Sequence, residues 1–407
     1  TSTFPFKGDN NINIPADNKA SFAHRINNSF SSYPGTLVID SIINVFLKKN
    51  HIKGASVAIT RKGQLVYAKG FGYANYIDSI ETIPSNLFRI ASVSKLITAT
   101  ALMKLAENGK LNLEDKVFGK NGWLNDSIFL KYADKRVEDI TIQHLLTHKA
   151  GWNHKRNDPV FGPLVIAKRL NLAKPAGTNE LIQYVLNQKL DFVPGRQYNY
   201  SNTGYCILGK IIEKASGMPY EDFVKFAILQ PLGIYNMQIG RSFPEEMPPD
   251  EVIYYINEKL QLYPAFDGSG ARVPLQYGGN NIELLGPAGG WIASAPELAK
   301  FIAAVDGFSD FPDILSRHSI KLMTRSYPKN NHLIGWRGSD GKGTWWRTGT
   351  LAGTAALVMR FNNELNWIIL LNTTPDKRSS IHNELSRTIY QCMQKVKDWP
   401  PIDLFAI

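Results

Sequence analysis

The sequence predicts an α+β fold in which one antiparallel sheet is flanked by terminal helices and interrupted by an inserted, mostly helical region. Three observations predict this class. Strand-like runs lie near both ends of the chain, a helix-rich stretch lies between them, and strands and helices form separate runs instead of alternating. We therefore expect an N-terminal leader at 1–32, a sheet region made of 33–109 and 285–407, and a helical region at 110–284.

The first half of the sheet region is expected to contain a hairpin between two helices. Apolar residues with helical spacing predict a helix over 36–50. Two β-rich runs, 55–60 and 65–69, are separated by a short basic turn with a glycine, which predicts a hairpin. Residues 93–108 are apolar on most faces and stop at a glycine, so they predict a buried helix.

The remaining elements follow from the same patterns. Residues 1–32 are rich in Asn, Ser and Phe without periodicity, so we expect a leader that is packed on the surface or partly mobile. Residues 241–284 are punctuated by prolines and predict loops. Helices are expected at 142–147, 204–215, 296–306 and about 378–397, and strands at 343–348, 353–361 and 366–372.

Composition and charge exclude several classes of protein. The chain has 407 residues, of which 43% are hydrophobic and 20% charged, as in ordinary globular proteins. The net charge is +11, but Lys and Arg are scattered and no nucleic-acid motif is present, so no nucleic acid is expected as a partner. The longest apolar runs, such as Trp367 to Leu371, fall far short of the roughly 18 residues of a membrane span. We therefore expect no integral membrane segment.

The chain ends and the cysteines give two further expectations. The first residue is Thr1 rather than Met, which we take to indicate a processed or trimmed form. Cys206 and Cys392 are too few for a disulfide framework, and each lies in an apolar, helix-like stretch. We expect two buried thiols, because free cysteine is among the most buried residue types.

The first motif with chemical content is Ser92-Val93-Ser94-Lys95, at the start of the predicted buried helix. Residues three apart lie on one face of a helix, so the Ser92 hydroxyl and the Lys95 amine would face the same side. A serine hydroxyl is a weak nucleophile until a base takes its proton. Lys95 could be that base or could stabilise negative charge, with help from the positive potential of the helix N-terminus. A helix cap with a solvated lysine is the alternative, but Lys95 lies in an apolar helix.

The second motif is Tyr200-Ser201-Asn202, on a loop between a Pro-Gly turn and an apolar helix. Catalytic residues often lie at such loop tips. A tyrosine near Lys95 could carry the proton of Ser92 to a leaving group. The amide of Asn202 could bond to a substrate carbonyl or to Lys95. Taken alone, a Tyr-x-Asn motif is far more typical of an ordinary turn.

The third motif is Arg347-Thr348-Gly349-Thr350, in a strand-like context. A glycine in a strand allows a substrate backbone to approach closely. The N–H of Thr350, with that of Ser92, could form an oxyanion hole. Arg347 offers a positively charged fork for a substrate carboxylate. We expect the four residues of the motif to bind substrate.

The order of the three motifs along the chain is that of one known type of site. The chain resembles the serine β-lactamase-related family, which includes class C β-lactamases, D-Ala-D-Ala carboxypeptidases, D-aminopeptidases and carboxylesterases. The resemblance covers roughly residues 35–400. It is also carried by the stretches LFRIASVSKLITATALMKLAENGKLNLEDKV, ITIQHLLTHKAGW, YSNTGYCILGKIIEKASGMPYEDFV and GPAGGWIASAPELAKFI.

The resemblance implies a β-lactamase/transpeptidase-like fold and acyl-enzyme chemistry. Ser92 would attack the substrate, Lys95 and Tyr200 would handle protons, and Asn202 would position the acyl chain. The backbone N–H groups of Ser92 and Thr350 would hold the oxyanion, and water would release the acid. The resemblance also implies a small-molecule or peptide substrate, no cofactor, and a secreted or periplasmic location.

Two departures from the family pattern bear on the substrate. Class C β-lactamases usually carry Tyr-Ala-Asn and Lys-Thr-Gly, whereas this chain has Tyr200-Ser201-Asn202 and Arg347-Thr348-Gly349. Arg and Lys are not interchangeable at sites with defined geometry. We therefore expect a peptidase- or esterase-like serine hydrolase. A β-lactamase, or a penicillin-binding sensor that acylates without turnover, is the alternative.

Other motifs point to weaker possibilities. His144 and His148 are four residues apart, but no glutamate lies between them as in His-Glu-x-x-His and no third ligand is evident, so no metal is expected. Gly70 and Gly72 lack the third glycine of a dinucleotide-binding loop. The absence of Gly-x-Ser-x-Gly argues against an α/β-hydrolase.

Four tryptophans lie close in sequence to these motifs and either line an apolar substrate pocket or pack in the core: Trp152, Trp291, Trp345 and Trp346. Gly289-Gly290, just before one of them, indicates that backbone approaches closely there.

Overall fold

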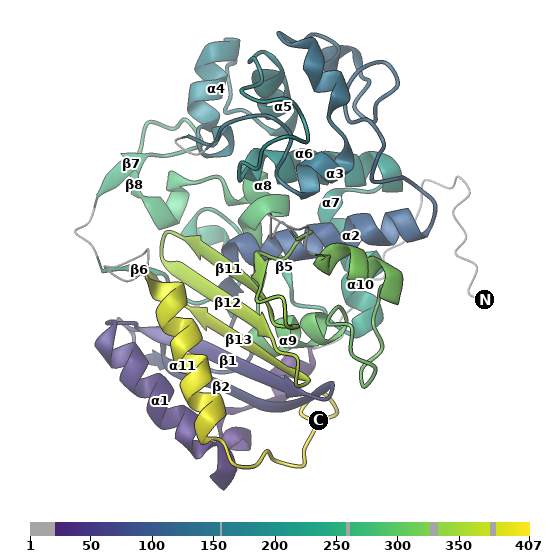
Figure 1. Ribbon diagram of the computed structural model, residues 1–407. Helices are drawn as coiled ribbons and strands as arrows, with labels where there is room; N and C mark the ends of the chain where they lie inside the picture. Colours follow the sequence, from purple (N-terminus) through teal and green to yellow (C-terminus); the bar gives the residue numbers. More distant parts are fainter. Residues whose placement is uncertain (1–20, 155–156, 258–260, 326–332, 375–379) are drawn as a thin grey trace.

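The computed structural model describes residues 21–154, 157–257, 261–325, 333–374 and 380–407, and its centre is a seven-stranded antiparallel sheet (Figure 1). Both ends of the chain contribute strands, as the sequence predicts. The order across the sheet is β10 (Gly338–Ser339), β11 (Trp345–Leu351), β12 (Thr354–Arg360), β13 (Leu365–Leu371), β1 (Gly54–Arg61), β2 (Gln64–Asn75) and β3 (Ile80–Glu81). The predicted α+β class is confirmed.

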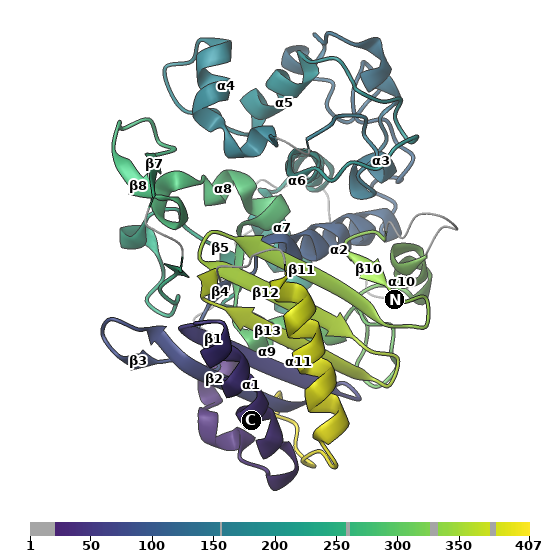
Figure 2. The same cartoon turned by 60° about the vertical axis from the view of Figure 1, so that its left-hand side comes forward.

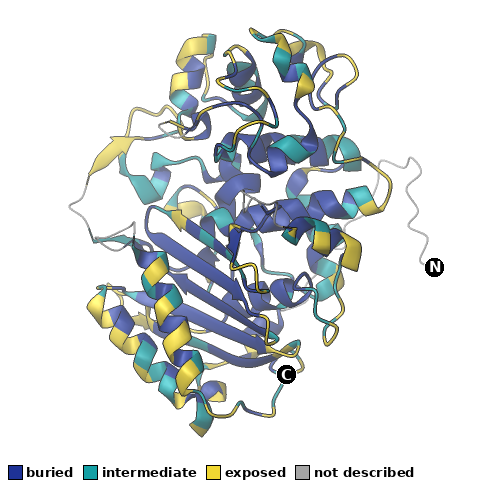
Figure 3. Cartoon of the chain, in the orientation of Figure 1, coloured by how far each residue is buried: buried dark blue, intermediate teal, exposed yellow. Residues whose placement is uncertain are grey.

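The first strand of the chain, β1, and the last strand of this sheet, β13, meet in its middle. β1 pairs with β13 in a register that places Ala58 opposite Ile368. Successive side chains of a strand point to opposite faces. Accordingly, Val57 and Ile369 belong to the core on one face, while Ala58 and Ile368 belong to the core on the other. Both faces of the central strands are therefore buried (Figure 3).

Helices cover the two faces of the sheet. The terminal helices α1 (Leu37–Lys49) and α11 (Ile381–Lys395) lie side by side on one face (Figure 2). Their buried side chains, such as Ile43 and Leu385, pack with the sheet, and their outer faces are exposed. The other face is covered by α9 (Ala295–Ala303), and the buried helix α2 (Ser94–Glu107) belongs to the same core.

A second layer of helices and small sheets comes mostly from residues between the early and late strands, although its last strand, Thr373–Thr374, follows them. The helices are α3 (Ile142–Leu146), α4 (Pro163–Leu170), α5 (Thr178–Leu186), α6 (Asn202–Ser216), α7 (Tyr220–Val224), α8 (Ile282–Leu285) and α10 (Arg317–Thr324). The helix α6 contacts α2, so it joins this layer to the sheet region. The small sheets are β4 (Phe88–Arg89) with β9 (Trp291–Ala293) and β5 (Gln238–Ile239), the hairpin β7 (Leu262–Pro264) and β8 (Arg272–Pro274), and β6 (Tyr255–Ile256) with β14 (Thr373–Thr374).

Several smaller expectations can be compared with this fold. Both cysteines are buried free thiols, as expected. The described residues of the region 241–284 include three short strands and most of α8, although the prolines of this region predict only loops. Residues 1–20 of the predicted leader lie outside the described residues, while 21–36 form short helical turns in which the buried Ser21 bonds to Glu297. Within the described ranges, no helix combines the length and the apolar character needed to cross a membrane.

Candidate active site

Ser92 lies in a short turn between β4 and α2. The turn spans Ala91–Val93, so Ser92 precedes α2 instead of opening it. Ala91 adopts φ +47°, a left-handed conformation that is uncommon for a residue with a side chain. The Val93 N–H closes the turn onto the Ile90 carbonyl at 3.1 Å. A strained backbone conformation persists only where the surrounding structure holds it in place, and such residues are often found at functional sites.

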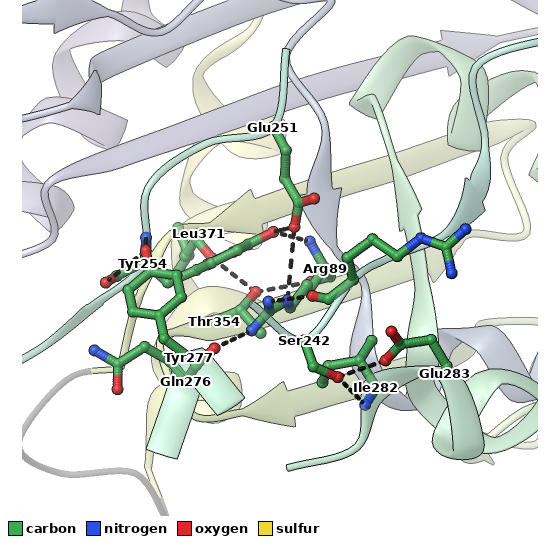
Figure 4. A network of polar contacts seen from close by, with 11 residues as sticks. Arg89, Ser242, Glu251, Tyr254, Gln276, Tyr277, Ile282, Glu283, Thr354 and Leu371 are labelled. Atoms are coloured by element: carbon green, nitrogen blue, oxygen red, sulfur yellow. Dashed lines mark hydrogen bonds and ion pairs between the residues drawn. The ribbon is translucent and has the colours of Figure 1, made fainter. Parts of the chain in front are cut away.

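Arg89, three residues before Ser92, is fixed through its backbone by two elements (Figure 4). Its N–H donates to the hydroxyl of Tyr254 at 2.8 Å, and its carbonyl accepts from the hydroxyl of Thr354 on β12 at 2.7 Å. The backbone that leads into the Ser92 turn is therefore held in place at Arg89.

The Arg89 side chain also bonds to residues of the inserted region. Its guanidinium donates to the carbonyls of Gln276 at 2.6 Å and Arg241 at 2.8 Å, and its Nε lies 3.6 Å from the carboxylate of Glu251. Both members of the ion pair are buried. Burial raises the pKa of Glu251 to about 7, although the positive charge of Arg89 acts in the opposite direction.

Lys95 extends from the first turn of α2 towards Ser92. Its Nζ donates to the Ser92 Oγ at 3.2 Å, the Asn202 Oδ1 at 2.7 Å and the Ala288 carbonyl at 2.6 Å. These acceptors match the three hydrogens of an ammonium group. The residue is fully buried, and burial lowers its pKa. The side chains of Ser92 and Lys95 are thus in contact, as the spacing of the motif predicts.

Tyr200 reaches the same hydroxyl from the loop before α6. Its OH lies 2.8 Å from the Ser92 Oγ and accepts a hydrogen bond from the Arg347 Nη2 at 3.1 Å. Burial raises the pKa of the Tyr200 phenol, but the positive charges of Lys95 and Arg347 outweigh burial and lower that pKa to about 8. With this pKa, about a tenth of the phenol is ionised at pH 7, and the phenolate form can accept a proton.

The loop that carries Tyr200 is held by polar contacts at the start of α6. The Ser201 side chain caps the helix by accepting from the Gly204 N–H at 2.9 Å. The buried Asp158 accepts from the Asn202 and Thr203 N–H groups. Because these are free donors of a helix N-terminus, a carboxylate there stabilises the helix. Asn202 is thereby placed with its carbonyl oxygen on Lys95.

The third motif lies inside β11, beside the Ser92 turn. A Cβ at Gly349 would lie 2.2 Å from the Ile90 carbonyl and 3.1 Å from the Ser92 nitrogen. Only glycine therefore permits this close approach. β10 pairs with β11 at Trp345 and Trp346, and within the described part of the chain no strand pairs with this edge of β11 from Arg347 onward. The backbone at Thr350 is thus brought next to that of Ser92.

Arg347 does not present the free fork that we expected for a substrate carboxylate. The residue is only 1% exposed. Its Nε donates to the Ser92 carbonyl at 2.7 Å, and its Nη2 donates to the Tyr200 hydroxyl. The guanidinium therefore joins the Ser92 turn to the loop that carries Tyr200, because a planar group with several donors can bond to both at once.

Two histidines next to this group were not predicted as site residues. The ring of His148, which has φ +57°, lies 4.4 Å from the ring of Tyr200, and its Nδ1 accepts from the Ser201 N–H. His382, at the start of α11, has its Nε2 3.1 Å from the Gly349 carbonyl. His148 lies in the stretch ITIQHLLTHKAGW, where the sequence suggested only a weak metal motif, and His382 belongs to no motif. Contacts between distant segments leave no signal in local spacing.

The tryptophans are mostly structural. Trp291 is fully buried and its indole donates to the hydroxyl of Tyr220, and Trp152 is also buried. Gly290, before Trp291, does mark a close approach, because a Cβ there would lie 2.3 Å from the Ile282 carbonyl. Among the described residues, no group of three or more His, Cys, Asp or Glu side chains is arranged to hold a metal ion.

Sequence comparison relates this chain to known proteins. A sequence model of the family described as Beta-lactamase matches residues 39–389. Penicillin-binding protein 4* of Bacillus subtilis (strain 168) is 32% identical over 211 residues, which are 51% of this chain and 42% of that protein. The chain thus spans less than half the length of the curated relatives it matches.

Solved structures show the same fold. The octameric penicillin-binding protein homologue from Pyrococcus abyssi is 26% identical with a TM-score of 0.65, over 87% of this chain and 77% of that chain. The D-amino acid amidase from Ochrobactrum anthropi SV3, in complex with L-phenylalanine amide, is 20% identical with a TM-score of 0.69, over 90% of this chain and 99% of that chain.

Proposed function

The chain belongs to the β-lactamase family, and on that premise we propose that it is a serine hydrolase that cleaves an ester or amide through an acyl-enzyme on Ser92. One observation carries the proposal. The Ser92 Oγ lies within hydrogen-bonding distance of both the Lys95 Nζ and the Tyr200 hydroxyl. A nucleophile in contact with a base, which is itself held by other groups, is the arrangement that covalent catalysis needs.

Acylation follows from these contacts. The Tyr200 phenolate takes the Ser92 proton as the Ser92 Oγ bonds to the substrate carbonyl carbon. The charges of Lys95 and Arg347 keep the phenolate available, since both lower the pKa of Tyr200. When the tetrahedral intermediate collapses, the bond to the leaving group breaks and the Tyr200 hydroxyl gives its proton to that group.

The negative charge of the intermediate needs donors that are already in place. The backbone N–H groups of Ser92 and Thr350 are the candidates, because Gly349 lets β11 pack directly on the Ser92 turn. Losing one such donor typically lowers turnover about 10²–10³-fold. Deacylation reverses the roles. Water gives a proton to Tyr200 and attacks the acyl carbon, and the Ser92 Oγ leaves with that proton.

The substrate is an ester or a peptide-like amide in preference to a β-lactam. Arg347 is buried and already donates to Ser92 and Tyr200, so it offers no free charge to a carboxylate. One observation favours the alternative, a β-lactamase or an acylating sensor. Arg337 is exposed and lies 5.5 Å from the Tyr200 ring, where a substrate carboxylate can reach it. A secreted or periplasmic location stays a prediction.

Intact-mass analysis tests the proposal directly. The protein is incubated with benzylpenicillin, a p-nitrophenyl ester or a D-Ala-D-Ala peptide, and the mass is followed with time. We expect a transient acyl adduct with the ester or peptide, and none in Ser92→Ala, whose turnover falls by at least about 10³-fold. A stable penicillin adduct without turnover would support the sensor. Undiminished turnover in Ser92→Ala would remove Ser92 from its role.

A further inference from the structure

A pocket of about 570 Å³ opens beside Thr350, whose backbone N–H is a candidate oxyanion donor. Three segments that are distant in sequence form it. They are the start of α4, the β7–β8 hairpin with the residues that follow it, and the end of β11 at Thr350, Leu351 and Ala352. Thr350 belongs both to this lining and to the third motif, so the pocket adjoins the candidate site at this residue. Its volume falls within the range of small-molecule pockets.

The chemistry of the pocket is neutral and largely apolar. None of the described residues that line it carries a charged side chain. Phe161 and Val165 remain 40% and 53% exposed, so large apolar groups face open space there. Of the polar lining residues, Tyr263 already bonds to Gln261 and Asn280 to the Leu275 carbonyl. A charged group would lose its hydration here without gaining a partner, whereas an apolar group would gain free energy from burial.

The position of the pocket along β11 decides which part of the substrate it meets. Arg347, the first residue of the third motif, bonds to the hydroxyl of Tyr200, so Tyr200 lies near the start of that motif. In the proposed mechanism Tyr200 gives its proton to the leaving group. Thr350 lies three residues further along the strand, roughly 10 Å away at the rise of an antiparallel strand. The leaving group therefore departs on the Tyr200 side of the oxyanion donor, and the acyl group extends past Thr350 in the opposite direction.

We infer that this pocket binds the acyl part of the substrate, and that the enzyme acts on esters or amides of neutral, apolar carboxylic acids with a medium-length aliphatic or an aromatic chain. The inference rests on the proposed function of Ser92. It assigns specificity to residues of α4 and of the β7–β8 hairpin, which no motif contains.

The experiment uses p-nitrophenyl esters that share a leaving group and differ only in the acyl chain, from acetate through butyrate and hexanoate to octanoate. We expect kcat/KM to rise about fourfold for each added methylene until the pocket is filled. Val165→Asp places a charge in the pocket, and aspartate in the first turn of a helix is well tolerated. It should lower the octanoate-to-acetate ratio of kcat/KM at least about tenfold.

Val45→Asp is the matched control, because Val45 is an exposed helical valine on α1, across the sheet. It should leave the ratio unchanged. A second series, acetate esters of ethanol, butanol and hexanol, varies only the leaving group. Val165→Asp should not change the preference within this series. A change there instead of in the acyl series would overturn the assignment of the pocket to the acyl group.

The outcomes separate this inference from the proposed function. If Ser92→Ala hydrolyses the acetate ester as fast as the wild type, the proposed function fails. If hydrolysis depends on Ser92 but kcat/KM is indifferent to acyl length, or Val165→Asp leaves the ratio unchanged, only the pocket assignment is overturned. A chain-length preference that Val165→Asp removes and Val45→Asp retains supports both.

Discussion

Arg347 donates a hydrogen bond at 3.1 Å to the hydroxyl of Tyr200, although 147 residues separate the two in the sequence. The same guanidinium holds the Ser92 carbonyl. Two consequences follow. The positive charge of Arg347 helps to lower the pKa of Tyr200. The two hydrogen bonds hold the loop that carries Tyr200 at a fixed distance from the Ser92 turn.

Replacing Arg347 should therefore shift the pH dependence of activity. The pKa of Tyr200 is about 8. Arg347→Gln removes one of the charges that lower it, so this pKa should rise and the ascending limb of the kcat/KM profile should move to higher pH. If the pKa rises from about 8 to about 9, the phenolate fraction at pH 7 falls about tenfold. Arg347→Lys keeps the charge but not the paired donors, so kcat should fall while the limb moves less.

The check is a kcat/KM profile from pH 5 to 10 for the wild type and both variants, with Tyr200→Phe as the control that lacks the titrating group. Thermal unfolding of each variant excludes a general loss of structure. An ascending limb that stays in place in Arg347→Gln would contradict the role given to the charge.

Gly349→Ala should damage both stability and turnover. The added methyl group would lie 2.2 Å from the Ile90 carbonyl, so β11 and the Ser92 turn must move apart. Overpacking of this kind typically costs about 1–3 kcal/mol of unfolding free energy. Displacement of the Thr350 N–H should lower kcat about 10²-fold, as when an oxyanion donor is lost.

Gly204→Ala is the matched control for urea unfolding and kinetics. A Cβ at Gly204 meets only ordinary contacts, at 3.5 Å and beyond, and the residue lies within α6. Alanine should be neutral or stabilising there, because glycine is unfavourable in a helix. Equal kcat for Gly349→Ala and the wild type would show that β11 does not position the reaction.

The sequence could predict which side chains meet in the candidate site because these residues occur in short motifs. Ser92 and Lys95 are one helical turn apart, so local spacing alone places them together. Tyr200 and Asn202 were found through the order of motifs and the family resemblance, not through any local rule. The strands at both ends of the chain could be assigned to one sheet because strand-like and helix-like residues form separate runs along the sequence.

The spacing of motifs in the sequence could not predict the residues whose contacts depend on the tertiary fold. The Ala288 carbonyl on Lys95 and the His382 ring at Gly349 come from segments without a motif. Arg347 was expected to face substrate, because its charge is visible in the sequence while its burial is not. The pocket at Thr350 combines segments from three parts of the chain, one of which reads only as a proline-rich loop.

Glu251→Gln should change how stability depends on pH. In the folded protein, burial raises the pKa of Glu251 to about 7 from the usual 4.5. Between these values the folded state holds a proton that the unfolded chain has released, so stability falls as pH rises from about 4.5 to about 7. Glutamine does not titrate. The unfolding free energy of the wild type, relative to Glu251→Gln, should therefore decline across this interval and level off above it.

Urea unfolding at half-unit steps from pH 4.5 to 8 measures this difference. Other buried carboxyls with raised pKa values, such as Asp306, are common to both proteins and cancel in the comparison. Glu245→Gln, at an exposed glutamate of the same region, is the control and should show no such trend. A difference that is constant or that increases with pH would contradict the burial argument.

His382 should act on the oxyanion donor without touching substrate. Burial lowers the pKa of His382, so its ring is neutral near pH 7, and the Nε2–H tautomer donates to the Gly349 carbonyl at 3.1 Å. That carbonyl and the Thr350 N–H belong to one trans peptide, in which they point in opposite directions. Holding the carbonyl on the α11 side therefore aims the N–H away from α11, towards Ser92.

His382→Ala frees this peptide, and kcat should fall about 10-fold or more while KM changes little, because the contact matters when charge develops on the oxygen. His382→Gln retains a donor and should restore part of the loss. Steady-state kinetics with a p-nitrophenyl ester, together with melting temperatures, separates the two roles open to this residue. If His382 served only the packing of α11, both variants would lose activity in proportion to stability and glutamine would give no selective rescue of kcat.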